Sequence, residues 1–112
     1  MSMSNSRAKG KRGELELSAR LRELGFDARR GQQYSGANGD ADVIGIDGLH
    51  IECKRTEQLR LWEALGQAQR DARAGEIPVV MHRANRRDWV AIMTLDDFAE
   101  LYRHGWSTWT SD

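Results

Sequence analysis

The sequence predicts an α/β fold in which a mixed β-sheet is flanked by helices. Some segments carry apolar residues at helical spacing, and several short runs are rich in the apolar residues typical of strands. The two kinds of segment are interleaved, in the expected order α-β-β-β-α-β followed by one more strand and helix. The chain has 112 residues and one cysteine, which is the size of one domain and excludes a disulfide framework.

The first helix is expected over residues 13–24. Its leucines recur at i, i+4 and i+7, and Gly25 follows where a helix commonly stops. The preceding residues are polar and basic and carry no apolar stripe. We therefore expect a flexible basic arm over residues 1–11 and a single domain over residues 12–112.

The other elements follow from apolar runs and the turn residues between them. An extended segment and then a turn-rich loop are expected after the first helix, and Gly75 and Pro78 separate the second helix from the next strand. The expected segments are extended chain at 26–34, a loop at 35–40, strands at 41–46, 49–55, 78–82 and 89–93, and helices at 59–74 and 94–102.

The Asp47-Gly48 dipeptide between two apolar runs predicts a hairpin, but two registers are open. A two-residue loop pairs Asp42 with Cys53. A three-residue loop with Gly48 in the left-handed conformation pairs Asp42 with Glu52. We predict the second register, in which both carboxylates lie on one face of the hairpin.

Three acids stand where local structure does not require them. Glu14 lies on the apolar stripe of its helix, where a carboxylate is costly unless it is paired or binds a cation. The alternative is that Glu14 only stabilises the helix N-terminus. Asp42 and Glu52 each lie inside an apolar strand, with Lys54 on the same face as Glu52. The alternative for these residues is a solvated sheet face with an ordinary Glu–Lys interaction.

Such a group has a specific chemistry. The carboxylates of Asp42 and Glu52 and the backbone carbonyl of Cys53 offer hard oxygen ligands for Mg²⁺, or for Mn²⁺. The bound metal would lower the pKa of a water molecule and offset charge on a phosphodiester. Lys54 would orient that water or stabilise the transition state.

The chain has 17 basic and 17 acidic residues, so a uniformly basic nucleic-acid-binding surface is excluded, whereas local basic clusters are present. These clusters and the glycine-containing loop at 32–39 are suited to a phosphate backbone. No segment has the pattern of an export signal or a membrane span, so we expect a cytoplasmic protein. The candidate DNA-binding residues are Arg7, Lys9, Lys11, Arg12, Arg29, Arg30, Gln33, Tyr34, Ser35, Arg83, Arg86 and Arg87.

The spacing of these acids resembles the D…ExK signature of the PD-(D/E)xK nuclease superfamily, because Asp42 is followed after nine residues by Glu52-Cys53-Lys54. The stretch from Lys9 to Phe26 resembles archaeal Holliday-junction resolvases, and residues 31–42 are similar to small phage and prophage proteins described as such resolvases. The resemblance covers about residues 9–103. It departs from the archaeal pattern at Leu15, where those enzymes carry a basic residue, and alanine stands at position 41 in place of the proline of the superfamily name.

The resemblance implies a restriction-endonuclease-like core and a metal-dependent endonuclease that cuts branched DNA as a homodimer. The implied catalytic residues are Glu14, Asp42, Glu52, Lys54 and Gln67. For the glutamine, the helical wheel favours Gln69 over Gln67, so both remain open. The alternatives are a nuclease for linear or single-stranded DNA, a catalytically silent DNA-binding module, and a small interaction protein.

Overall fold

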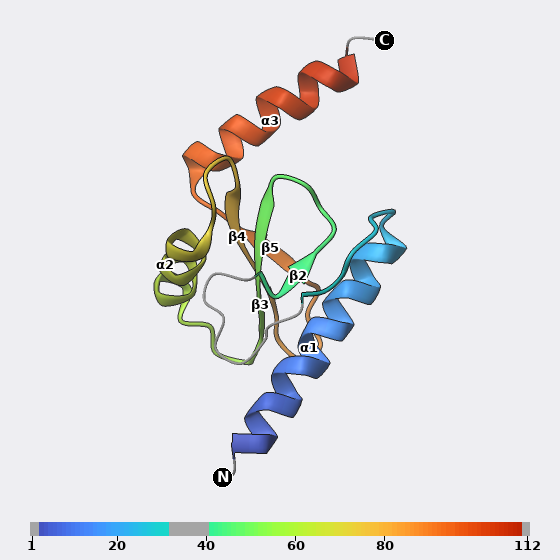
Figure 1. Cartoon of the computed structure of the whole chain (residues 1–112), viewed down its shortest axis with the longest axis vertical. Coiled ribbons are helices and arrows are strands. Elements are labelled where there is room, and N and C mark those ends of the chain that lie inside the picture. The colour runs from blue at the N-terminus through green and yellow to red at the C-terminus, as the bar shows by residue number, and fades with distance from the viewer. Residues whose placement is uncertain (1–2, 32–40, 111–112) are drawn as a thin grey trace.

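The computed structural model describes residues 3–31 and 41–110, with side chains described over 8–31 and 41–105. It contains a five-stranded sheet in the order β1-β2-β3-β4-β5, with α1 and α2 on opposite sides (Figure 1). Strands β3 and β4 are parallel, and the other pairs are antiparallel. The predicted α/β fold with a mixed sheet is confirmed. The elements are α1 (Met3–Glu23), β1 (Arg29–Arg30), β2 (Val43–Ile44), β3 (Leu49–Arg55), α2 (Leu61–Asp71), β4 (Ile77–Arg83), β5 (Val90–Ile92) and α3 (Leu95–Thr110).

Helix α1 ends where the sequence predicts but begins ten residues earlier, at Met3. Residues 3–11, which the sequence predicts as part of a flexible arm over residues 1–11, are helical in the structure. Residues 8–12 are exposed, so this part of the helix carries no apolar stripe by which the sequence could reveal it. At the other end, Gly25 adopts φ +102° and ends the helix as expected.

The β2–β3 hairpin has the predicted three-residue register. Val43 pairs with Ile51, which places Asp42 opposite Glu52. Gly48 adopts φ +87°, a left-handed conformation that a residue with a side chain rarely accepts. Strand β3 has the predicted bounds, whereas β2 is shorter than the predicted strand over 41–46.

Two apolar layers hold the sheet between the helices. On one side Leu17 and Leu21 of α1 pack against Val43, Ile51 and other strand residues. On the other side Ala64, Leu65 and Ala68 of α2 pack against Val80. Because side chains alternate along a strand, the even-numbered residues of β3 face α2. This alternation places Glu52 on the α2 side of the sheet.

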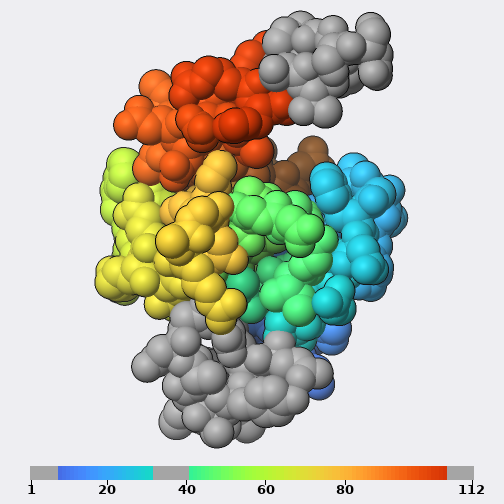
Figure 2. All heavy atoms as spheres, turned by 45° about the horizontal axis from the view of Figure 1, so that its top comes forward, coloured from blue at the N-terminus to red at the C-terminus, as the bar shows by residue number. Residues whose placement is uncertain are grey.

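Helix α3 lies at one end of the molecule, with much of its surface uncovered (Figures 1 and 2). The Thr94 hydroxyl accepts a hydrogen bond from the Asp97 N–H at 3.1 Å and so caps the N-terminus of the helix. The helix continues to Thr110, beyond the predicted end at residue 102. In the described part of the chain, no helix is both long and apolar enough to cross a membrane.

Candidate active site

Asp42 and Glu52 lie side by side on neighbouring strands, and both are buried. Glu52 also pairs with Val80 of β4, on the side of the sheet that packs against α2. The Oδ2 atom of Asp42 accepts a hydrogen bond from the backbone N–H of Cys53 at 2.8 Å. This bond fixes the Asp42 carboxylate at the start of β2, beside the middle of β3.

Glu52 is a carboxyl group whose ionised form is disfavoured. Burial is the largest cause, and with the neighbouring Asp42 carboxylate it raises the pKa of Glu52 to about 8, against the opposing effect of Lys54. Among the described residues, none forms a hydrogen bond with the buried Oε2 atom. A buried carboxylate without a donor is stabilised by a nearby cation. The environment of Glu52 is thus suited to a metal ion.

Glu14 reaches the same group from the opposite side of the sheet. Its side chain is 13% exposed, and its Oε1 atom accepts a hydrogen bond from Arg30 Nε at 2.7 Å. Burial and the Asp42 carboxylate raise the pKa of Glu14, while Arg30 acts in the opposite direction. Asp42 therefore interacts with both Glu14 and Glu52, and the three carboxylates form one cluster centred on Asp42 at the β2 edge of β3.

Lys54 lies two residues beyond Glu52 on the same face of β3. It lines a hollow of about 290 Å³ together with Gln67 of α2. Gln69 is exposed instead. The structure thus places Gln67 beside Lys54, because the buried face of α2 is formed by Ala64, Leu65 and Ala68.

The donor set at this edge fits a hard divalent cation such as Mg²⁺. Asp42 and Glu52 supply carboxylate oxygens, and Glu52 Oε2 lacks a hydrogen-bond partner within the described ranges. The N–H and the carbonyl of one strand residue point to the same edge. Because the Cys53 N–H points to Asp42, its carbonyl lies on that side as well. The Cys53 thiol packs against the α1-side core, and burial raises its pKa, which disfavours the thiolate form.

His50 and Asp71 belong to the surroundings of Glu52, although the sequence did not single them out as site residues. His50 is 2% exposed, and its Nε2 atom lies 4.0 Å from Glu52 Oε2. Asp71, the last residue of α2, comes close to the same two side chains. The sequence does contain a pattern that could have indicated Asp71. This residue follows Ala64 and Ala68 at helical spacing, so it lies on the same face of α2 as these buried residues.

The candidate DNA-binding residues are spread over several surfaces. Lys9, Lys11 and Arg12 are exposed on α1, and Arg86 and Arg87 are exposed in the β4–β5 turn. Figure 1 shows that turn at the end of the sheet toward which the N-terminal half of α1 extends. The Arg7 side chain and residues Gln33, Tyr34 and Ser35 lie outside the described residues.

Three of the candidate DNA-binding arginines lie outside these two elements, on strands β1 and β4. Arg29 is exposed on β1, and Arg30 is bound to Glu14 as described above. Arg83 forms an ion pair with Glu16 of α1 at 2.5 Å, and Arg55 of β3 approaches the same carboxylate at 3.3 Å. Arg30 therefore positions a site carboxylate, and Arg83 joins α1 to the ends of β3 and β4.

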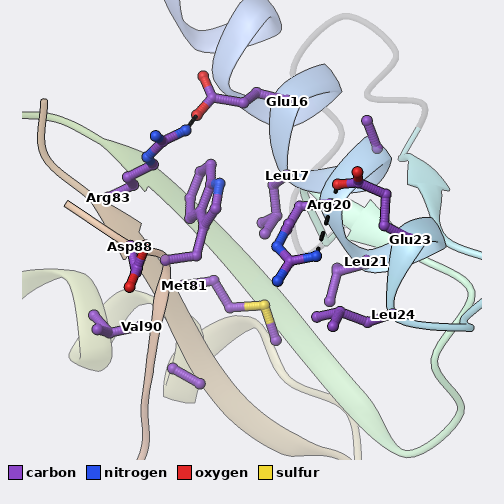
Figure 3. Close-up of a pocket in the computed structure, with 13 residues that line it drawn as sticks. Glu16, Leu17, Arg20, Leu21, Glu23, Leu24, Met81, Arg83, Asp88 and Val90 are labelled. Atoms are coloured by element: carbon purple, nitrogen blue, oxygen red, sulfur yellow. Dashed lines mark hydrogen bonds and ion pairs between the residues drawn. The ribbon is translucent and has the colours of Figure 1, made fainter. Parts of the chain in front are cut away.

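A groove of about 710 Å³ lies between α1 and strands β4 and β5 (Figure 3). Leu17, Leu21 and Met81 form part of its floor, and the Glu16–Arg83 pair lies at one end. None of the candidate catalytic residues lines it. The groove and the carboxylate cluster are therefore separate features.

No protein-family model and no curated protein sequence matches this chain. Among solved structures, the chain is similar to Hjc, a Holliday junction resolvase from the archaeal hyperthermophile Archaeoglobus fulgidus. The match has a TM-score of 0.59 and 26% sequence identity, and it covers 73% of this chain and 74% of that chain. The arrangement of a mixed sheet with flanking helices is thus a fold that this chain has in common with the archaeal resolvase.

Proposed function

We propose that this protein is a divalent-metal-dependent DNA endonuclease that cuts branched DNA, in particular four-way junctions. The observation that carries the proposal is the meeting of Glu14, Asp42 and Glu52 beside Lys54, at one edge of β3. The similarity to the structure of a Holliday junction resolvase supports both the reaction and the substrate class. The reaction is hydrolysis of a phosphodiester bond.

Asp42, Glu52 and the Cys53 carbonyl would hold Mg²⁺ or Mn²⁺. When bound, the metal ion supplies a water of lowered pKa and offsets negative charge on the phosphate. Lys54 carries a positive charge at the same face, so it would orient the attacking water or stabilise charge on the phosphorus oxygens. Gln67 lines the hollow beside Lys54 and would position the same water or phosphate.

Glu14 and Arg30 act as a pair that positions Asp42. The short Arg30–Glu14 contact holds the Glu14 carboxylate next to Asp42. A cation shared among these carboxylates would offset their mutual repulsion. In this arrangement Glu14 supports the metal or its water, as the resemblance to the resolvases implies.

The DNA backbone would follow the exposed cations of α1 and of the β4–β5 turn. Lys9, Lys11, Arg12, Arg86 and Arg87 are exposed on these two elements. Phosphate contacts of this kind give affinity without reading sequence. A protein that recognises DNA by its branched shape needs such contacts on more than one arm.

A homodimer would place two active sites on the two strands that must be cut in a four-way junction. Helix α3 offers a surface for this contact, because Leu95, Phe98, Leu101 and Tyr102 are exposed along one side of it. Their spacing of three and four residues gives a continuous apolar stripe. We propose that two copies pair through this stripe.

The test is cleavage of end-labelled DNA by the wild type and by Lys54→Ala. The substrates are a four-way junction, a flap, linear duplex and single strand, each with Mg²⁺, Mn²⁺ or EDTA. Arg103→Ala, which removes an exposed cation from α3, is the matched control. We expect paired symmetric nicks on the junction, lost with EDTA and in Lys54→Ala but retained in Arg103→Ala.

Other results would revise the proposal in defined ways. Cutting restricted to linear or single-stranded DNA would keep the active site and reject the junction as substrate. Salt-sensitive DNA binding without cutting under any metal condition would indicate a catalytically silent binding module. Binding to none of the four substrates would reject nucleic acid as the partner.

A further inference from the structure

We propose that His50, Glu52 and Asp71 form a second cation site, which takes a transition-metal ion such as Mn²⁺ or Zn²⁺. His50 and Glu52 come from the α2 side of β3, and Asp71 comes from the C-terminal end of α2. One ligand atom from each residue lies within 4.8 Å of the other two. This second site requires only metal binding, so it does not depend on nuclease activity.

The cluster contains two buried atoms that lack partners. His50 Nε2 and Glu52 Oε2 are both inaccessible to solvent, and neither forms a hydrogen bond anywhere in the described part of the chain. Each unsatisfied buried polar group costs stability, so two facing each other indicate a missing partner. The proposed cation would satisfy both atoms at once.

The spacing of these two atoms suits an ion better than a direct hydrogen bond. They are 4.0 Å apart, whereas a hydrogen bond between nitrogen and oxygen has a length of about 2.7–3.2 Å. Bonds from zinc to imidazole nitrogen and to carboxylate oxygen are each about 2.0–2.2 Å long. In a tetrahedral site with such bonds the two donor atoms would lie about 3.4 Å apart, so the observed gap would close by about half an ångström when the ion binds, and Asp71 would supply the third ligand.

The donor types select the class of metal. An imidazole nitrogen favours Zn²⁺ over Mg²⁺ and Ca²⁺, which prefer oxygen ligands alone, and the carboxylates of Glu52 and Asp71 also suit Mn²⁺. Glu76 Oε1 lies 3.7 Å from His50 Nδ1, which is longer than a hydrogen bond but places a carboxylate on the far side of the ring. In metal sites a carboxylate hydrogen-bonded at that position orients the histidine ring.

The two proposed sites share Glu52 but differ in their other ligands. Asp42 approaches Glu52 from β2, and Asp71 approaches it from α2. Changing Asp42 therefore removes the candidate catalytic site, whereas changing Asp71 or His50 removes the second site. This difference makes the two proposals separable by mutation.

The experiment is titration of the DNA-free protein with Mn²⁺ and with Zn²⁺. Calorimetry measures binding of either ion, and the electron paramagnetic resonance signal of free Mn²⁺ measures binding of Mn²⁺. The variants are Asp71→Asn, His50→Gln and Asp42→Asn. Glu63→Gln, which changes an exposed acid on the same helix as Asp71, is the matched control. Circular dichroism and thermal unfolding establish that each variant is folded.

We expect Asp71→Asn and His50→Gln to weaken binding of one Mn²⁺ or Zn²⁺ ion at least tenfold, while Glu63→Gln and Asp42→Asn retain that ion. Wild-type affinity and stoichiometry in folded Asp71→Asn would overturn the inference, and this result would decide even if His50→Gln failed to fold. Retention of the ion in a protein that cuts no DNA would support the second site while rejecting the nuclease.

Discussion

Asp42 Oδ2 accepts a hydrogen bond from the backbone N–H of Cys53 across the β2–β3 hairpin, at a distance of 2.8 Å. The bond engages one oxygen of a buried carboxylate that also interacts with Glu14 and Glu52. It also joins the two strands at the point where the acids meet. The same side chain therefore contributes to strand register and to the candidate metal site.

Replacing Asp42 by asparagine separates these two contributions. Asparagine retains an oxygen that can accept the Cys53 N–H but loses the negative charge. We expect Asp42→Asn to fold normally and to reduce junction cleavage by about 10²-fold or more, the scale seen when one electrostatic group of an active site is removed. Asp42→Ala would in addition lose about 0.5–1.5 kcal/mol of the free energy of unfolding.

Denaturant unfolding and single-turnover cleavage, measured on the same preparations, check this prediction. The wild type and Arg103→Ala serve as references for both measurements. Wild-type cleavage by folded Asp42→Asn would show that the charge of Asp42 is not required for the reaction.

The raised pKa of Glu52 predicts a pH dependence of stability in metal-free buffer. The unfolded chain loses the Glu52 proton near the ordinary pKa of 4.5, whereas the folded protein keeps it until the pH reaches about 8. Between these values the folded state binds more protons, so the free energy of unfolding should fall as the pH rises. The fall should level off above about pH 8, where both states are ionised.

Glu52→Gln should flatten this dependence, because glutamine carries no proton to lose. A smaller slope should remain from Glu14, whose pKa is also raised. Urea unfolding in EDTA at several pH values is the measurement, and Glu63→Gln should behave as the wild type. An equal slope in Glu52→Gln and in the wild type would contradict the assignment of the titration to Glu52.

Local sequence signals were sufficient for the hairpin and for the acids it carries. Gly48 favours the left-handed conformation that a three-residue loop needs, and that loop alone puts Asp42 opposite Glu52. Glu14 was recognisable because a carboxylate on an apolar stripe needs a partner, and the structure supplies Arg30 and Asp42.

What could not be predicted depends on how distant elements pack. The helical wheel favours Gln69 over Gln67, but the buried residues of α2 are Ala64, Leu65 and Ala68, and Gln67 lines the hollow beside Lys54. Likewise, the approach of Asp71 to His50 requires α2 to return across β3. Helix periodicity gives the amphipathic face only to within about one residue position, and no pattern in a single segment encodes such contacts.

Because Gly31 has no side chain, the backbone at Ala41 and Asp42 can lie directly against it. Replacing Gly31 by alanine should therefore disturb the site. A Cβ atom at this position would lie 2.1 Å from the carbonyl oxygen of Ala41. The Gly31 N–H also donates to the Asp42 carbonyl at 2.9 Å. The strand carrying Asp42 must therefore move, at a cost of about 1–3 kcal/mol typical of overpacking.

We expect Gly31→Ala to lower both the free energy of unfolding and the rate of junction cleavage. Gly10→Ala is the control, because a Cβ there has no neighbour within 4 Å and alanine favours a helix. The control should be as stable as the wild type or slightly more stable. Unchanged stability in Gly31→Ala would show that Ala41 accommodates the added methyl group.

The apolar stripe on α3 predicts self-association that depends on protein concentration. Leu95 is 78% exposed and Phe98 is 51% exposed, which is costly for large apolar side chains unless a partner covers them. Charges placed in this stripe should repel across a twofold contact, since each residue meets its own copy or a close neighbour. Phe98→Glu combined with Leu101→Glu should therefore shift the protein toward the monomer without unfolding it.

Sedimentation velocity over a range of concentrations measures the shift. Arg103→Glu is the matched control, because it adds negative charge on the opposite face of α3. We expect the control to remain dimeric and the stripe variant to nick four-way junctions on one strand without the paired second cut. A wild-type protein that sediments as a monomer at every concentration, yet makes paired cuts, would show that the two nicks come from separate encounters with the junction.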